Sequence, residues 1–113
     1  MSLKYYDRDG KPLTQEQFID FFESLCDVMS YKRVAETTLS DGKWVSTVWL
    51  GLDHRFLEEG PPLIFETMVF PSHENLLDLA CSRWSTLEEA TVGHEEVVKK
   101  WTKKIEDERQ QKS

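Results

Sequence analysis

The sequence predicts an α+β fold, in which a small antiparallel, meander-like sheet of about four strands has an N-terminal and a C-terminal helix packed on one face. Apolar residues recur at helical spacing near both ends of the chain, and runs with strand-like alternation lie between them. Short clusters of turn-forming residues separate most of these runs, which favours antiparallel neighbours. With 113 residues and 39% hydrophobic content, residues 1–113 are expected to form a single domain.

The N-terminal segment is predicted to contain a short strand and then a helix. Residues 3–6 are the strand candidate, and the turn-forming residues 7–10 close it. Thr14 and Gln17 have the spacing of a capping box and should begin the helix. The apolar side chains of this helix should face the core, and they are Phe18, Phe21, Phe22, Leu25 and Met29.

The centre of the chain is predicted to form a β-hairpin. Residues 31–39 are rich in β-branched side chains, and residues 44–52 alternate in the manner of a strand. The four residues 40–43 between them are turn formers, and Gly42 supplies the left-handed backbone position that such a turn requires.

The C-terminal half is predicted to contain two further strands and a long helix. Residues 63–70 form the third strand of the sheet, and residues 79–84 form a shorter fourth one. Ser85 and Glu88 have the spacing of a second capping box. Residues 106–113 are charged and polar, and we expect them to fray. The apolar stripe of the helix is Leu87, Ala90, His94, Val97, Val98, Trp101 and Ile105.

The two strands 44–52 and 63–70 are apolar on both sides, which has a consequence for assembly. The helices of so small a chain can cover only one face of the sheet. We therefore expect Trp49, Met68 and Phe70 to lie on a second, uncovered face. A homodimer or higher homo-oligomer that buries this face is predicted, with a ligand groove as the alternative.

Composition argues against several classes of partner. A formal charge of −7 and a pI near 4.9 argue against a nucleic-acid-binding protein. The one basic patch lies at residues 99–104, where Lys99 and Lys100 follow Glu95 and Glu96 by four residues, and this spacing favours pairing on a solvated helix face. No apolar run approaches the roughly 18 residues of a membrane span, so no membrane partner is predicted. Cys26 and Cys81 lack metal-binding or signal-peptide context and are expected to be buried, reduced thiols of a cytoplasmic protein.

Three residues around the third strand are candidates for a binding site. Asp53 and His54 follow a strand end, where loops often hold binding groups, although loop capping by Asp53 explains them equally well. Glu66 stands alone among apolar neighbours, and a buried carboxylate without a partner is costly. We expect it to be exposed at an edge, to form an ion pair with Arg33 or Arg83, or to contact a ligand.

Further candidates lie at and within the last helix. Arg83 and Trp84 are suited to hold an anion and to stack on a base, or else to serve as surface charge and packing. His94 lies on the apolar stripe, as a core histidine with a satisfied hydrogen bond or as a ligand contact. Gly93 costs ~1 kcal/mol relative to alanine in a helix, so it indicates close approach of another backbone, a partner subunit or a ligand.

The sequence does not support catalysis or metal binding. It contains no HxxxH, HxH or CxxC spacing, no Gly-x-Ser-x-Gly elbow and no phosphate-binding glycine loop. Neither a metal nor a cofactor is therefore predicted. A small hydrolase that uses Asp53, His54 and Glu66 would require these three side chains to lie within hydrogen-bonding reach of one another.

Three segments resemble a family of small bacteriophage and prophage proteins of largely unassigned function. They are VSTVWLGLDH at 45–54, PPLIFETMVF at 61–70 and RWSTLEEATVGHEEVVKKW at 83–101, and they cover about the last two thirds of the chain. In that family a run of glycines usually follows LGLDH, whereas residues 55–60 here read RFLEEG. The family also has Arg-Tyr-Ser-Thr where residues 83–86 read Arg-Trp-Ser-Thr. The side chains of 55–60 argue against a backbone cradle for phosphate in this loop.

The resemblance implies a phage accessory protein in the host bacterial cytoplasm, and class-level analogy then predicts its role. The leading hypothesis is a phage-encoded, non-enzymatic counter-defence protein that sequesters a small nucleotide-type signal. The alternative is a phage protein that binds and inhibits a host bacterial protein through an exposed aromatic sheet face, and a small hydrolase is the second alternative. The ligand-binding residues of the leading hypothesis are Trp49, Asp53, His54, Glu66, Arg83, Trp84 and His94.

Overall fold

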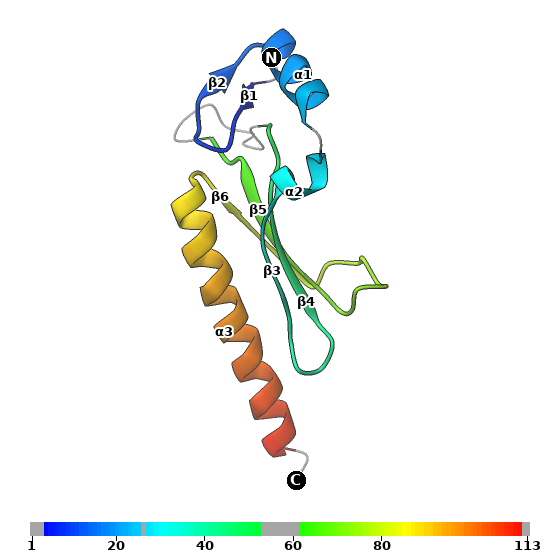
Figure 1. Cartoon of the computed structure of the whole chain (residues 1–113). Coiled ribbons are helices and arrows are strands. Elements are labelled where there is room, and N and C mark those ends of the chain that lie inside the picture. The colour runs from blue at the N-terminus through cyan, green and yellow to red at the C-terminus, as the bar shows by residue number, and fades with distance from the viewer. Residues whose placement is uncertain (1–3, 26, 53–61, 112–113) are drawn as a thin grey trace.

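The computed structural model describes residues 4–25, 27–52 and 62–111, and it confirms the α+β class (Figure 1). A four-stranded sheet packs against the long C-terminal helix, and a two-stranded ribbon lies beside the N-terminal helix. No helix in these ranges is long and apolar enough to cross a bilayer. The elements in chain order are β1 (Tyr5–Tyr6), β2 (Pro12–Leu13), α1 (Gln15–Ser24), α2 (Val28–Lys32), β3 (Arg33–Thr38), β4 (Trp44–Trp49), β5 (Phe65–Phe70), β6 (Ala80–Trp84) and α3 (Leu87–Gln111).

The large sheet is the predicted meander. Its strand order is β3-β4-β5-β6, and each neighbouring pair is antiparallel. The predicted hairpin joins β3 to β4, and Gly42 has a φ of +95° in the turn. The Leu39 amide donates to the Lys43 carbonyl at 2.7 Å, which closes that turn.

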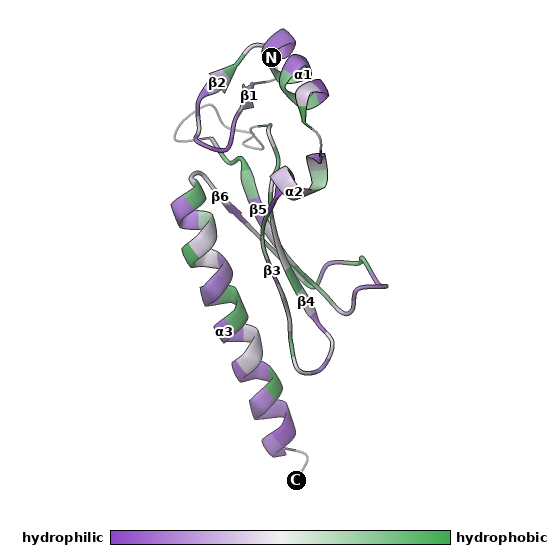
Figure 2. Cartoon of the chain, viewed as in Figure 1, coloured by the Kyte–Doolittle hydropathy of each residue, from purple (hydrophilic) through white to green (hydrophobic). Residues whose placement is uncertain are grey.

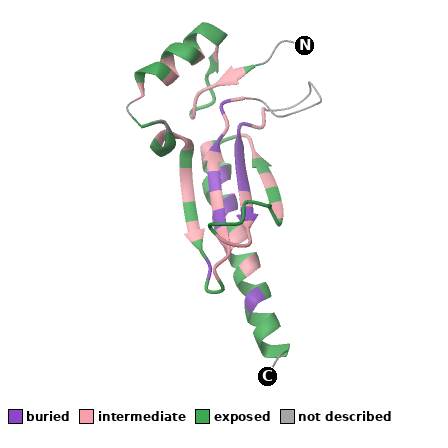
Figure 3. Cartoon of the chain, turned by 90° about the vertical axis from the view of Figure 1, so that its right-hand side faces the viewer, coloured by how far each residue is buried: buried purple, intermediate pink, exposed green. Residues whose placement is uncertain are grey.

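α3 covers one face of this sheet along its length (Figure 1). Burial is concentrated in the two middle strands and on the side of α3 that faces them (Figure 3). Leu39, Val45, Val69 and Ile105 form one core cluster there. The last turns of α3 are almost wholly hydrophilic (Figure 2), yet the helix continues through residues 106–111, where the sequence predicted fraying.

α1 meets the same face of the sheet only at one end, through aromatic side chains. The capping box of Thr14 and Gln17 starts the helix as predicted. Its phenylalanines then surround Trp49, and the ring of Phe22 stacks on the indole with centroids 5.6 Å apart. Tyr31 approaches the same indole edge-on from α2 at 4.9 Å.

Two helix boundaries differ from the sequence prediction. The helix expected to extend to Met29 ends at Ser24, because Asp27 caps a separate short helix by accepting from the Ser30 amide at 3.1 Å. Met29 consequently lies on the surface, not in the core. At α3, Thr86 accepts from the Glu89 amide at 3.0 Å, so the cap is one residue later than predicted.

The prediction that Trp49 lies on the uncovered face is wrong. Trp49 pairs with Phe65 and is 0% exposed, enclosed by α1, α2 and α3. Directly opposed residues of an antiparallel pair project to the same face, and Trp44 pairs with Phe70. Trp44, not Trp49, therefore shares the uncovered face with Phe70 and Met68.

Candidate functional site

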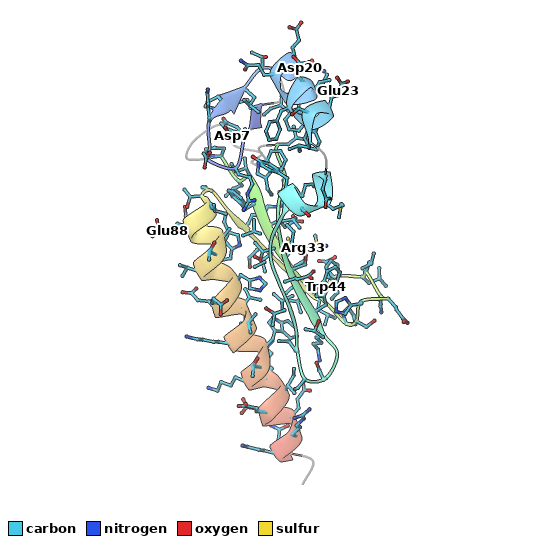
Figure 4. All side chains as sticks on the ribbon, in the orientation of Figure 1. Asp7, Asp20, Glu23, Arg33, Trp44 and Glu88 are labelled. Atoms are coloured by element: carbon cyan, nitrogen blue, oxygen red, sulfur yellow. The ribbon has the colours of Figure 1, made fainter. Side chains whose placement is uncertain are left out.

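Within the described residues, the face of the sheet opposite α3 carries no covering element, and we call it the open face. A groove of about 250 Å³ crosses it from α2 to the loop that follows β5. Figure 4 labels Arg33 and Trp44 on this side of the molecule. The groove is lined by Met29, Lys32, Arg33, Trp44, Ser46, Val48, Glu66, Met68, Phe70 and Leu76.

Trp44 is the aromatic centre of the open face. Its indole stacks on His73 with ring centroids 4.6 Å apart, and Phe70 lies 5.4 Å away. Thr38 Oγ1 and His73 Nε2 are 2.8 Å apart, which holds the imidazole over the indole. Trp44 Nε1 is buried and has no acceptor among the described residues. Buried donors are normally paired, so this N–H is one of the exceptions among the described residues.

An ion pair lies at the other end of the open face. The register places Glu66 opposite Arg83, and Arg83 Nε donates to Glu66 Oε2 at 3.1 Å. Glu66 is 8% exposed, so this contact meets the expectation that the carboxylate would be paired. Lys32 forms no ion pair with any residue that the structure describes, and Arg33 pairs with Glu36 at 3.3 Å in an exposed position.

Cys81 also lies on this face, and it is exposed where the sequence predicted burial. It is paired with Met68 across β5 and β6. Partial burial and then the charge of Glu66 raise the pKa of the thiol. The thiolate is therefore disfavoured at neutral pH, which makes Cys81 a poor nucleophile. Cys26 lies outside the described residues.

Trp84 and His94 belong to the opposite face, beneath α3. The Trp84 indole donates to Thr67 Oγ1 at 2.9 Å, and Thr67 and Thr47 Oγ1 are 2.5 Å apart. His94 Nδ1 lies 2.7 Å from Thr47 Oγ1. Its Nε2 lies 2.9 Å from Thr37 Oγ1. We call these five residues the threonine–histidine chain, which crosses the sheet from β3 to β6.

One end of this chain has a fixed direction, because an indole N–H can only donate and Thr67 therefore accepts from Trp84. A hydroxyl can also accept twice, so the bonds among Thr67, Thr47, His94 and Thr37 can run in either direction, each with its own tautomer of the neutral ring. In both directions each ring nitrogen of His94 has a threonine hydroxyl as its partner. Burial lowers the pKa of His94 and favours this neutral form. His94 is thus a satisfied core histidine and not a ligand contact in this structure.

The glycine at position 93 was expected to allow close approach of another group. In the structure that group is the indole of Trp84 from the same chain. A Cβ built on Gly93 would lie 2.3 Å from Trp84 Cζ2. A hollow of about 280 Å³ remains beside this contact, lined in part by Glu88, Glu89 and Glu96. Carboxylates repel phosphate oxygens, so this hollow is unsuited to a nucleotide.

The structure brings together only part of the predicted site. Glu66 and Arg83 share the open face, whereas Trp49, Trp84 and His94 lie on the α3 side. Arg83 and Trp84 diverge because successive residues of a strand project to opposite faces. Asp53 and His54 lie outside the described residues, so the hydrolase hypothesis stays a prediction.

Sequence reasoning missed Trp44, Lys32 and Arg33 as groove residues. The alternation of β4 did contain a signal, because it placed Trp44 opposite Trp49 in side-chain direction. Only the register to β5 shows which of the two tryptophans joins Met68 and Phe70.

Within the described ranges, no group of three or more His, Cys, Asp or Glu side chains is placed to hold a metal ion. No family model, curated protein or solved structure matches the chain.

Proposed function

We propose that this protein is a non-enzymatic binding protein whose open face takes a polypeptide segment. The observation that carries the proposal is the uncovered groove, which joins an apolar and aromatic floor to a cationic rim. Such a surface fits a segment that presents apolar side chains next to carboxylates. Like the host-protein alternative, this proposal uses the aromatic sheet face to bind a polypeptide, and it replaces nucleotide sequestration as the leading hypothesis.

The size and chemistry of the groove favour a polypeptide over a small molecule. Its volume of about 250 Å³ falls below the roughly 300–1,000 Å³ typical of small-molecule pockets. Trp44, Met68 and Phe70 are of the residue types enriched at protein interfaces. Trp44 is the expected main contributor, because tryptophan dominates the binding energy of many interfaces.

Charge adds selectivity for the segment. The chain carries a formal charge of −7, so most of its surface repels an acidic partner. Lys32 and Arg33 line one end of the groove and supply positive charge there, with Arg33 also paired to Glu36 and with the Glu66 carboxylate in the same groove lining. A carboxylate on the bound segment would pair with them, which improves the association rate and orientation more than the affinity.

One observation favours nucleotide sequestration as a second candidate, namely that Arg33 and Trp44 line the same groove. An arginine and an aromatic ring are suited to a phosphate and a base. Against this, the residues predicted for that role lie on both faces of the sheet. The phage origin and the counter-defence role rest on the sequence resemblance and stay predictions.

A selection from a displayed random-peptide library tests the proposal. Peptides enriched on the wild-type protein should combine apolar residues with Asp or Glu, and fluorescence anisotropy then measures their affinity. Met68→Asp should weaken that binding at least tenfold, because it places a carboxylate on the floor of the groove.

Val92→Asp is the matched control, since Val92 is 52% exposed on α3, away from the groove. It should leave the affinity unchanged, and circular dichroism should show that both variants remain folded. Failure to enrich any peptide on protein whose open face is free, or equal binding by the Met68→Asp variant, would overturn the proposal.

A further inference from the structure

The loop between β5 and β6 projects away from the sheet on the side opposite α3 (Figure 1), and we call residues 71–79 the arm. It carries three exposed leucines, with exposed fractions of 65% at Leu76, 77% at Leu77 and 47% at Leu79. Its backbone is held by local contacts, since Ser72 Oγ accepts from the amides of Glu74 and Asn75 at 3.3 and 3.1 Å. The leucines are thus presented on an ordered loop next to an apolar groove.

We propose that the open face binds the arm of a second copy of this chain, so that two copies exchange arms in a symmetric dimer. The inference rests on the proposed function, because it names the polypeptide segment that the groove takes. Leu77 is the side chain expected to enter the partner's groove.

The layout of the groove permits a closed two-fold arrangement. The groove extends from Met29 on α2 to Leu76 on the arm. A two-fold axis parallel to the open face, and perpendicular to the line from α2 to the arm, places each arm against the α2 of the other copy. The same contact is then made twice, and this symmetry closes the assembly at two copies.

The charges at the two ends of the groove are complementary. Lys32 and Arg33 lie at the α2 end, whereas the arm carries Glu74 and Asp78 in exposed positions. In the two-fold arrangement the acidic arm of one copy meets the basic end of the other. Two chains of formal charge −7 repel one another in general, so a local match of this kind is what a self-association surface requires.

Sedimentation equilibrium and native mass spectrometry of the wild-type protein test the inference. We expect a dimer that Leu77→Asp converts to a monomer, while Val92→Asp leaves the dimer intact. Leu77 is exposed, so its replacement does not disturb the core of the protomer.

A charge exchange then identifies the surfaces that meet. The double variants Lys32→Glu/Arg33→Glu and Glu74→Lys/Asp78→Lys should each be monomeric, because like charges oppose one another at both contacts. An equimolar mixture of the two should form a heterodimer, because each contact then joins opposite charges. A wild-type monomer, a dimer that survives Leu77→Asp, or a mixture without heterodimer would overturn the inference.

The failure of this inference is distinguishable from failure of the proposed function. Peptide selection is repeated on the Leu77→Asp variant, whose open face is intact. Peptide binding by that variant together with a monomeric wild type overturns only the arm exchange. Absence of both peptide binding and dimerisation overturns both proposals.

Discussion

The indole of Trp84 lies so close to Gly93 that no side chain fits between them. A Cβ on Gly93 would lie 2.3 to 2.6 Å from three atoms of the indole. Since Trp84 also donates to Thr67, the ring is held from two sides, and it sets the position of α3 on the sheet.

Gly93→Ala should destabilise the fold. The substitution gains ~1 kcal/mol of helix propensity, but the new methyl group overlaps the indole and forces a shift that costs up to about 3 kcal/mol. We expect a net loss of about 1–2 kcal/mol in the free energy of unfolding, measured by urea denaturation. Val92→Ala, at the neighbouring exposed position, is the control. A Gly93→Ala variant as stable as this control would contradict the close contact between Gly93 and the Trp84 indole.

Stability should fall as the pH decreases through the titration range of histidine. Burial lowers the pKa of His94 below its ordinary value of 6.5, so the unfolded chain takes up a proton before the folded one does. The contribution of His94 is therefore complete above pH 6.5 and is lost as the pH falls from that value toward the folded pKa. Urea denaturation at a series of pH values from about 8 to about 5 measures this change in the free energy of unfolding. The His94→Gln variant should be less stable at neutral pH, but its free energy of unfolding should change less with pH over this range. If the pH dependence is the same as in the wild type, it does not come from His94.

Thr47→Val should be more destabilising than its small volume change implies. Thr47 joins Thr67 to His94 in the threonine–histidine chain, and the substitution removes the partner of His94 Nδ1 and one of the two partners of Thr67 Oγ1. Such losses cost about 1–3 kcal/mol. Ser46→Ala on the open face is the matched control. A double-mutant cycle of Thr47→Val and Thr67→Val should show coupling of at least about 0.5 kcal/mol, and strict additivity would mean that the two hydroxyls do not interact.

Native mass spectrometry with cyclic and ADP-ribose-type nucleotides should give no mass increment on the protein. The expectation follows because the predicted nucleotide-binding residues of the described chain lie on both faces of the sheet. A stoichiometric increment that Trp44→Ala or Arg33→Ala removes would instead favour nucleotide sequestration over polypeptide binding.

Much of the fold was predictable because its signals are local. The Thr14 capping box and the Gly42 turn depend on residues a few positions apart, and the structure contains both. The meander follows from the short connections between alternating runs. The helix beyond Ser24 was mispredicted because an apolar stripe and the cap of a new helix at Asp27 overlap in sequence, and hydrogen bonding at Ser30 decides between them.

The chain by itself therefore determined the α+β class, the strand order and the presence of an uncovered apolar face. The tertiary structure alone decided which tryptophan lies on that face and which charges meet on it. Side-chain direction in a strand has a period of two, so one step in register exchanges the core face for the open face. The register is fixed by pairs such as Trp44 with Phe70, which are far apart in the sequence. This register places Trp49 in the core and Trp44 at the groove.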